Sequence, residues 1–287
     1  MPERDGYLPG VPCWVDTNQP DPKAAVDFYR GLFGWDFEDM MPPGAPGSYF
    51  MARQHGGDVA AIGSIPDGAQ PMAMWNTYIA VADTDAAAAK VRQAGGRVVS
   101  DPFDVMEAGR MAVLSDPEGA AFSVWQAGQH KGARVVNEAG ALNFNGLNTR
   151  DVAAAKSFYR AVFGWQTLDV GGAEMWTLPG YGDELEKATP GLRKMIAEFG
   201  AATGFEDVVA SINPIGADQA GVPAHWSVTF GTDDADATAA KAAELGGSLV
   251  LAPFDAPWTR MTVIRDPQGA TFIASKFVPE NRDLGSA

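Results

Sequence analysis

The segments FYRGLFGW (residues 28–35) and FYRAVFGW (residues 158–165) are two copies of one motif, with six identical letters in eight. The match extends upstream without gaps, because PCWVDTNQPDPKAAVD precedes the first copy and LNFNGLNTRDVAAAKS precedes the second. Each copy is typical of a short strand, a turn and a helix, and Gly34 ends the first helix before a new strand begins. The chain therefore contains an internal repeat. The aromatic residues expected in the core are Phe28, Trp35, Phe158 and Trp165.

A second pair of related segments follows downstream of each copy. WNTYIAVADTDAAAAKVRQAGGRVV (residues 75–99) matches WSVTFGTDDADATAAKAAELGGSLV (residues 226–250), and each is typical of a strand followed by a helix. GRMAVLSDPEGAAFSVWQ (residues 109–126) matches TRMTVIRDPQGATFIASK (residues 259–276), and each predicts two strands joined by an Asp-Pro-x-Gly turn. Together the segments predict four strand-helix-strand-strand-strand units, two in each half of the chain.

The length of 287 residues exceeds the usual size of one domain, so we predict two modules, at 1–132 and 133–287. The segment 127–142, in which Gly and Ala alternate with polar residues, is expected to connect them. The spacing between matching segments grows in the second module, which predicts a helical insertion near 183–204. The apolar face of this extra helix is expected to carry Leu192, Met195, Ile196 and Phe199.

The composition argues against several functional classes. A formal net charge of −15 and a pI near 4.5 argue against nucleic-acid binding, which requires a basic surface. The single cysteine, Cys13, cannot form an internal disulfide. The first residues lack the apolar run of a signal peptide, and no apolar stretch reaches the roughly 18 residues of a membrane span. We therefore expect a cytoplasmic protein without a membrane partner.

The order of these motifs resembles that of the vicinal oxygen chelate superfamily, with DFYRGLFGW and SFYRAVFGW after first strands and DPEGAAF and DPQGATF before last strands. This superfamily includes glyoxalase I, extradiol dioxygenases, fosfomycin-modifying enzymes and bleomycin resistance proteins. The resemblance covers nearly the whole chain and is closest in detail to two-module actinobacterial proteins. It implies an α+β fold in which two units curl into a half-open, eight-stranded cup with the ligand inside. Which half-modules pair to form each cup stays open.

In the metal-dependent members, the cup holds a divalent ion on inward-facing His, Gln or Glu side chains. The resemblance places the corresponding positions on Trp14, Asn76, Ser123, Phe144, Ser227 and Ile273. None of these six residues is a usual metal ligand, and exchanging halves between modules only reshuffles the same set. We therefore expect no metal and no other cofactor. The alternative is a metal-dependent lyase or dioxygenase whose ligands lie at other positions.

The same strands carry aromatic and amide side chains typical of a pocket for a flat or partly apolar small molecule. The predicted substrate-binding residues are Trp14, Asn76, Tyr78, Ser123, Trp125, Phe144, Trp176 and Ser227, with Trp226 in the same group. Alternate residues on such strands face the helix layer, so the competing interpretation places some of these aromatic side chains in the core.

Asp16 is the predicted general base, because it lies at an inward position of an otherwise apolar strand, where burial would raise the pKa of its carboxyl. The alternative is a carboxylate at a strand end that accepts N–H groups of the turn near Asn18. The corresponding residue of the second module is Gly146, which removes a polar group and opens space. His225 is the second predicted catalytic residue. It shares a cavity with Asp16, as an acid–base pair, if the first half of module 1 pairs with the second half of module 2; otherwise it is an exposed histidine at a strand start.

Arg110 and Arg260 occupy matching places at the start of paired strands. A guanidinium there could bind an anionic substrate group through its planar fork. The favoured interpretation is structural, with each arginine tying its hairpin to Asp116 or Asp266 of the neighbouring turn.

These observations predict a metal-independent protein that binds an aromatic or carbonyl-bearing metabolite, or acts on it by acid–base chemistry, in a biosynthetic, resistance or detoxification role. The alternatives are a metal-dependent enzyme of the same superfamily and a non-catalytic binding protein. Whether the chain is an enzyme stays open. Because two modules in one chain supply the pair that single-module relatives form between chains, we expect a monomer or a weak homodimer.

Overall fold

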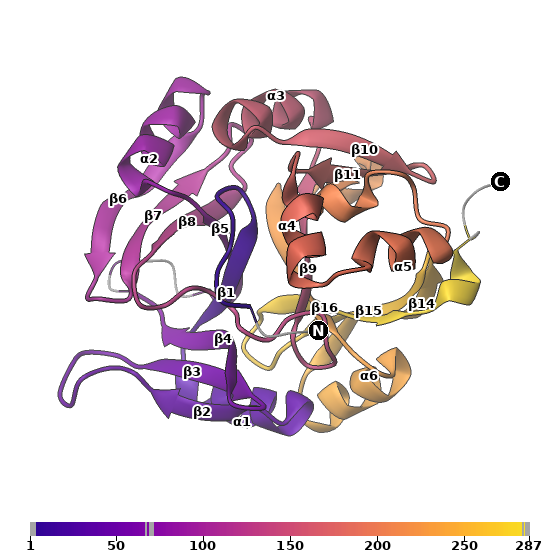
Figure 1. The fold of residues 1–287 in the computed structure, drawn as a ribbon. Helices are drawn as coiled ribbons and strands as arrows, with labels where there is room; N and C mark the ends of the chain where they lie inside the picture. The colour runs from indigo at the N-terminus through magenta and orange to yellow at the C-terminus, as the bar shows by residue number, and fades with distance from the viewer. Residues whose placement is uncertain (1–3, 67, 69–71, 283, 285–287) are drawn as a thin grey trace.

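The computed structural model describes residues 4–66, 68, 72–282 and 284, which form two eight-stranded sheets with helices around them (Figure 1). Sheet A belongs to the first module. Its first unit contains β1 (Pro12–Gln19), α1 (Pro22–Phe33), β2 (Asp36–Asp39), β3 (Tyr49–Gln54) and β4 (Gly57–Ser64). Its second unit contains β5 (Met74–Ala80), α2 (Thr84–Gln93), β6 (Arg97–Val105), β7 (Gly109–Ser115) and β8 (Ala121–Ala127). The strand order is β2-β3-β4-β1-β5-β8-β7-β6, with β1 and β5 antiparallel where the two units meet.

Sheet B belongs to the second module and repeats this plan. Its first unit contains β9 (Leu142–Thr149), α3 (Val152–Phe163), β10 (Gln166–Val170), β11 (Ala173–Thr177) and β12 (Val208–Pro214). Its second unit contains β13 (His225–Gly231), α6 (Ala235–Glu244), β14 (Ser248–Ala256), β15 (Thr259–Arg265) and β16 (Thr271–Phe277). The strand order is β10-β11-β12-β9-β13-β16-β15-β14. The predicted α+β fold of two tandem modules is therefore confirmed, and both halves of one module share one sheet.

The first helix of each module begins and ends at signals that the sequence carries. The side chain of Asp21 accepts hydrogen bonds from the N–H groups of Lys23 and Ala24, which otherwise lack partners in the first turn of α1. Asp151 caps α3 in the same way. Gly34 ends α1 with a left-handed φ of 72°, a conformation that glycine adopts without steric cost.

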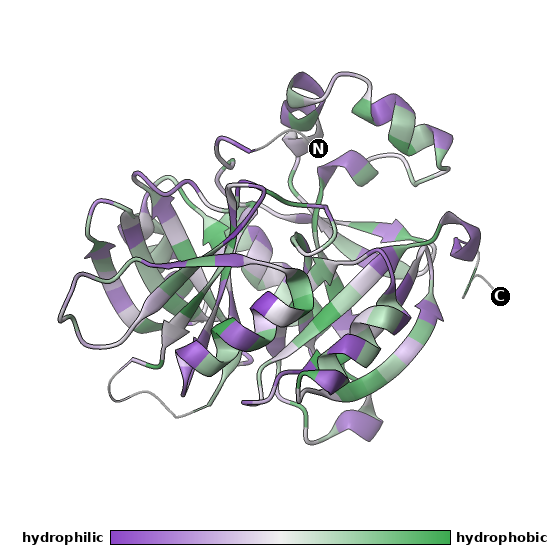
Figure 2. Ribbon diagram, turned by 90° about the horizontal axis from the view of Figure 1, so that it is seen from below, coloured by the Kyte–Doolittle hydropathy of each residue, from purple (hydrophilic) through white to green (hydrophobic). Residues whose placement is uncertain are grey.

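The helices of the two modules pack against each other, so each hydrophobic core contains residues of both modules. In Figure 1, α1 lies next to α6 of the second module and α3 next to α2 of the first, and both pairs are in contact. The ring of Phe33 lies 5.3 Å from that of Phe230, and the ring of Tyr159 lies 5.9 Å from that of Phe122. Four repeated aromatic residues are almost completely buried, as predicted: Phe28, Trp35, Phe158 and Trp165. Figure 2 shows hydrophobic residues along the strands that these helices cover.

Each repeated tyrosine bonds to the Asp-Pro-x-Gly turn of the other module. The hydroxyl of Tyr29 donates to Asp266 Oδ2 at 3.0 Å and accepts from Trp75 Nε1 at 3.0 Å. The hydroxyl of Tyr159 donates to Asp116 Oδ2 at 3.2 Å, and Trp226 Nε1 donates to it at 2.9 Å. All of these side chains are buried, so the two modules are joined by hydrogen bonds that water does not reach.

The predicted arginine–turn ties are wrong, because those turn aspartates already have buried partners. Arg110 instead pairs with Asp85 at 2.8 Å and with Asp104 at 2.9 Å. Arg260 pairs in the same way with Asp236 and Asp255. Both arginines thus join the start of a helix to a neighbouring strand on the surface.

The insertion lies between β11 and β12 and contains two short helices, α4 (Tyr181–Ala188) and α5 (Leu192–Glu198). One continuous helix does not form because Pro190 and the left-handed Gly191, with φ of 90°, interrupt it. The ring of Phe199 lies 5.6 Å from that of Phe277, at the end of β16. Figure 2 shows the insertion standing above the sheets, beside the marked N-terminus. No helix of the described residues is long and apolar enough to cross a membrane.

Candidate functional site

The inner face of sheet A, called cup A here, is centred on a buried carboxylate. Asp16 Oδ1 accepts a hydrogen bond from Asn76 Nδ2 at 2.8 Å. Its Oδ2 accepts from the hydroxyl of Tyr78 at 2.7 Å and from that of Tyr49 at 3.1 Å. Trp14 Nε1 in turn donates to the Tyr49 hydroxyl at 3.2 Å. The predicted residues Trp14, Asp16, Asn76 and Tyr78 therefore meet in one network.

Burial controls the ionisation of this network. It raises the pKa of the Asp16 carboxyl above its ordinary value of 3.8, and the hydrogen bonds from Asn76, Tyr78 and Tyr49 oppose the shift. Burial also raises the pKa of Tyr49 and of Tyr78, and the neighbouring Asp16 charge adds to the effect. The hydroxyls therefore remain donors, which is the role that their geometry requires.

Large side chains fill cup A. Trp14 and Asp16 are each 3% exposed, Trp125 is 6% exposed, and Ser123 beside them is also buried. His130, from the segment that connects the modules, covers the tryptophans, with its ring 4.4 Å from Trp14 and 5.9 Å from Trp125. Its backbone carbonyl accepts a hydrogen bond from Trp125 Nε1. Cup A is thus closed by the protein itself.

The inner face of sheet B, called cup B here, carries smaller side chains at five of six matching positions. The strand registers match Trp14 to Phe144, Asp16 to Gly146, Asn76 to Ser227, Tyr78 to Thr229, Ser123 to Ile273 and Trp125 to Ser275. Three bulky or charged side chains are therefore replaced by glycine, threonine and serine. The partly exposed residues of this face include Phe144, Asn148, Ser211, Asn213, Ser227 and Ile273. The lining of cup B is thus smaller and in part more exposed than that of cup A, while Thr229 and Ser275 are themselves buried.

Two predicted aromatic contacts with ligand are corrected by the structure. Trp176 is completely buried in the core, with its ring 5.4 Å from those of Tyr159 and Trp165. Trp226 also belongs to this core and donates to the Tyr159 hydroxyl. Both side chains thus point toward helix α3, as the alternation of residues along a strand requires.

Asp16 and His225 lie in different sheets, so the condition for a shared acid–base pair is not met. Asp16 pairs with Asn76 in sheet A, whereas His225 pairs with Asn148 in sheet B. The Nδ1 atom of His225 lies 2.8 Å from the carbonyl oxygen of Pro223, which can only accept, so Nδ1 carries a proton. His225 ends cup B at the start of β13.

The donor set does not fit a metal site of the superfamily type. The six matching positions carry tryptophan, phenylalanine, isoleucine, asparagine and two serines, none of which supplies an imidazole or a carboxylate. Across the described part of the chain, no group of three or more His, Cys, Asp or Glu residues is placed to hold a metal ion. The residues of both cups are therefore suited to hydrogen bonding and apolar contact rather than to metal ligation.

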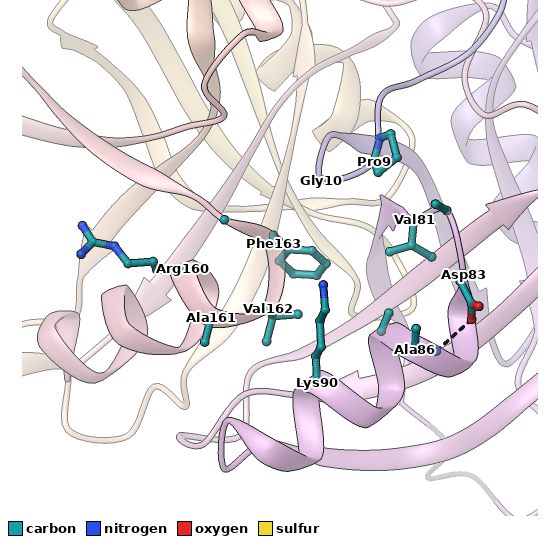
Figure 3. A pocket seen from close by; sticks show the side chains of 13 residues that line it. Pro9, Gly10, Val81, Asp83, Ala86, Lys90, Arg160, Ala161, Val162 and Phe163 are labelled. Atoms are coloured by element: carbon teal, nitrogen blue, oxygen red, sulfur yellow. Dashed lines mark hydrogen bonds between the residues drawn. The ribbon is translucent and has the colours of Figure 1, made fainter.

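Two cavities lie outside both cups. One, of about 440 Å³, lies between α2 and α3, where Lys90 extends toward Phe163 and Asp83 caps the helix (Figure 3). The other, of about 420 Å³, lies between the N-terminal segment and α4, where Arg4 donates to the Tyr181 hydroxyl at 2.8 Å.

Sequence reasoning missed three residues that shape the cups: Tyr49 in cup A, and Ser211 and Asn213 in cup B. Tyr49 lies on β3 of the first module. Ser211 and Asn213 lie on β12, the strand that follows the insertion in the second module. The signal that could have found them is the alternation along β3, β4 and β12, because residues two apart share a face.

Comparison with known proteins identifies the family to which the chain belongs. A family model for the Glyoxalase/Bleomycin resistance protein/Dioxygenase superfamily matches residues 14–124 and 141–273, and the chain belongs to this superfamily. It is 42% identical over 286 residues to CFP32 of Mycobacterium tuberculosis, covering 98% of this chain and 100% of the relative. It is 36% identical over 280 residues to the anthracycline biosynthesis protein DauV of Streptomyces sp. strain C5, covering 93% of each chain.

Solved structures agree on the fold. The Mn(II)-bound glyoxalase from Novosphingobium aromaticivorans matches with a TM-score of 0.58 and 15% identity, over 94% of this chain and 83% of that one. The 2,3-dioxygenase LapB from Pseudomonas sp. KL28 matches with a TM-score of 0.58 and 13% identity, over 94% of this chain and 93% of its own. At such low identity, these likenesses show the fold alone.

Proposed function

We propose that this protein binds, or acts on, a flat and partly apolar small molecule bearing carbonyl or hydroxyl oxygens, and that cup B is its site. The observation that carries the proposal is the contrast between the cups. Cup A is filled by Trp14, Tyr78 and Trp125, whereas the matching residues of cup B leave a partly exposed face of mixed aromatic and polar character.

The relationship to an anthracycline biosynthesis protein supports this class of ligand. Anthracyclines are flat polycyclic molecules with several carbonyl and hydroxyl groups. Phe144 and Ile273 offer apolar contact with such a ring system, and Ser227 offers a hydroxyl for an oxygen substituent. Because neither cup has a donor set of the superfamily type, the proposed function is independent of a metal. Because one chain already holds two modules, the proposed state is a monomer or a weak homodimer.

Equilibrium dialysis with 2-acetylnaphthalene tests this proposal. Ser275→Trp restores in cup B the tryptophan of cup A and should reduce binding at least about tenfold, since it removes the space for the ring. The matched control is Lys276→Trp, one residue along on the exposed side of β16, which should bind as the unchanged protein does. Equal binding by all three proteins would contradict the proposal. So would one equivalent of transition metal in protein purified without chelator, if binding is lost when that metal is removed.

A second candidate function is acid–base chemistry in cup A. The observation that favours it is the buried Asp16 carboxylate with the Tyr78 hydroxyl 2.7 Å away, since burial raises the pKa of both groups. It requires His130 to move aside from Trp14. Asp16→Asn should then abolish conversion of a carbonyl substrate without affecting the dialysis result for cup B.

A further inference from the structure

Two polar side chains of β12 distinguish the floor of cup B from that of cup A. The registers place Ser211 beside Gly146 and Asn213 beside Asn148. In cup A, the same places are held by Ala61 and Gly63. In cup A the polar side chain lies on β1, as Asp16. In cup B the matching residue of β9 is Gly146, and the polar side chain lies on the neighbouring strand β12, as Ser211.

These side chains converge over Gly146 together with that of Ser227. A Cβ atom at position 146 would lie 2.6 Å from both Asn213 Nδ2 and Ser211 Oγ, and 3.1 Å from Ser227 Oγ. Only glycine leaves room for this arrangement. The three polar atoms thus surround the place that the Asp16 side chain occupies in cup A.

Some of the polar side chains around Gly146 have hydrogen-bond donors and acceptors that the described part of the chain does not use. Ser227 is engaged, because its hydroxyl donates to the Gly146 carbonyl and accepts from Asn148 Nδ2 at 3.1 Å. The side chains of Ser211 and Asn213 make no hydrogen bond to the described part of the chain. In cup A, by contrast, the Asp16 carboxylate accepts three hydrogen bonds.

The charge around Ser211 and Asn213 indicates whether they bind a charged or a neutral ligand group. The inner-face positions of β9, β12 and β13 carry no Lys, Arg, Asp or Glu, and the chain as a whole has a net charge of −15. The titratable side chain among them is His225, at the end of the cup, where its Nδ1 is bonded to the Pro223 carbonyl. A buried carboxylate or phosphate without a cation would be strongly disfavoured there. A neutral oxygen accepts N–H and O–H donors at a far smaller desolvation cost.

We propose that Ser211 and Asn213, brought together over Gly146, anchor a neutral carbonyl or hydroxyl oxygen of the ligand of cup B. This inference rests on the proposed function and adds the substituent that determines specificity. Asp16 of cup A is the internal counterpart of that ligand oxygen, because it fills the same place in its own sheet with an oxygen acceptor.

Equilibrium dialysis of the full chain with matched probes tests the anchor. The probes are 2-acetylnaphthalene, 2-ethylnaphthalene, which has the same shape without the oxygen, and the anion 2-naphthoate. We expect the acetyl compound to bind about tenfold tighter than the ethyl compound, which corresponds to one or two net hydrogen bonds. The double variant Ser211→Ala/Asn213→Ala should bind both neutral probes equally, with the affinity for the ethyl compound unchanged.

Gly146→Ala should have the same effect, since its methyl group displaces the ends of both side chains. The matched control is Gly221→Ala, where an added Cβ would meet no atom within 4 Å. Thermal melts of each variant establish that it is folded. A preference for the acetyl compound that persists in the double variant, or tighter binding of 2-naphthoate, overturns the anchor.

The Ser275→Trp variant separates this inference from the proposed function. If it abolishes binding of both neutral probes while the double variant keeps the acetyl preference, cup B is the site and the anchor is wrong. If it changes neither, the proposed function itself fails.

Discussion

Asp16 and Gly146 occupy the same place in their sheets, and this difference changes the chemistry at the centre of each cup. A carboxylate without a cation is stable in cup A only because three donors surround it. Removing the carboxylate in the second module frees those positions from that requirement, so Thr229 can replace a tyrosine and Ser227 can replace an amide. Glycine at position 146 therefore removes the carboxylate and also permits different side chains at positions 227 and 229.

The buried carboxyl makes stability depend on pH in a direction opposite to that of most aspartates. Because burial raises the pKa of Asp16, the folded protein holds this proton more tightly than the unfolded chain does. Its contribution to the free energy of unfolding is therefore largest below pH 3.8 and decreases as the pH rises toward the folded pKa, by at most about 1.4 kcal/mol per pH unit. We expect Asp16→Asn to lose this decrease, as measured by urea unfolding from pH 4 upward.

Asp85→Asn provides the opposite control. The hydrogen bond from Arg110 lowers the pKa of the Asp85 carboxyl, so its contribution is present above the ordinary pKa and is lost in acid. The difference between the unchanged protein and Asp16→Asn should thus fall with rising pH, while the difference for Asp85→Asn rises. A flat difference for Asp16→Asn would show that the folded structure does not shift this group.

At the scale of elements, much of the fold can be predicted because each unit carries its own local signals. Capping aspartates, the glycine after each first helix and the Asp-Pro-x-Gly turns act over a few residues, so the sequence displays them directly. The side on which a strand residue lies is harder to predict. Trp176 and Trp226 fall in the core because strand registers, which set the facing, depend on partners far away in the chain.

The insertion is the element with no counterpart in the first module. Its helix α4 packs on the core through Tyr181, whereas α5 is mostly exposed. Of the four apolar residues predicted to share a face, Leu192 is buried, whereas Met195 is 46% and Phe199 is 44% exposed. The ring contact of Phe199 with Phe277 joins α5 to the far edge of cup B. Phe277 lies on the same side of β16 as Ser275, so Phe199 contacts the end of β16 on the side of cup B.

Loss of this ring contact should loosen the insertion without affecting the sheets. An aromatic pair is worth about 0.5–1.5 kcal/mol, so we expect Phe199→Ala to speed amide hydrogen exchange of segment 181–207 by about two- to twelvefold. The measurement is exchange followed by mass spectrometry of peptides. Met195→Ala, on the same helix, serves as the control and should exchange as the unchanged protein does. Unaltered exchange in Phe199→Ala would mean that the contact does not hold the insertion.

At the scale of the whole molecule, the pairing of half-modules could not be read from the sequence. The two copies are so similar that either half can complete either sheet in principle, and local signals are identical in both arrangements. What decides is the path of the chain, which builds each sheet within one module and packs α1 against α6 and α3 against α2. Tyr29 and Asp266 form part of this contact, because their side chains meet across the modules.

Because each hydrophobic core contains residues of both modules, the predicted modules 1–132 and 133–287 should not fold alone as monomers. Isolated 1–132 would expose the side of α1 that packs on Phe230 and Phe272. Four aromatic residues lose partners there: Phe28, Tyr29, Phe33 and Trp35. At about 1.5–3 kcal/mol each, their exposure costs roughly as much as the 5–15 kcal/mol that stabilises a typical domain.

We therefore expect each fragment alone to lack the near-ultraviolet circular dichroism of fixed aromatic side chains, and the two fragments refolded together to regain it. The intact chain should unfold in one cooperative transition for the same reason. Sedimentation of the fragments sharpens the test. A folded dimer of 1–132 is compatible with a shared core, since a second copy supplies a repeat of the missing half-core. A folded monomer of either fragment contradicts it, because such a monomer would need a core that the structure divides between the two modules.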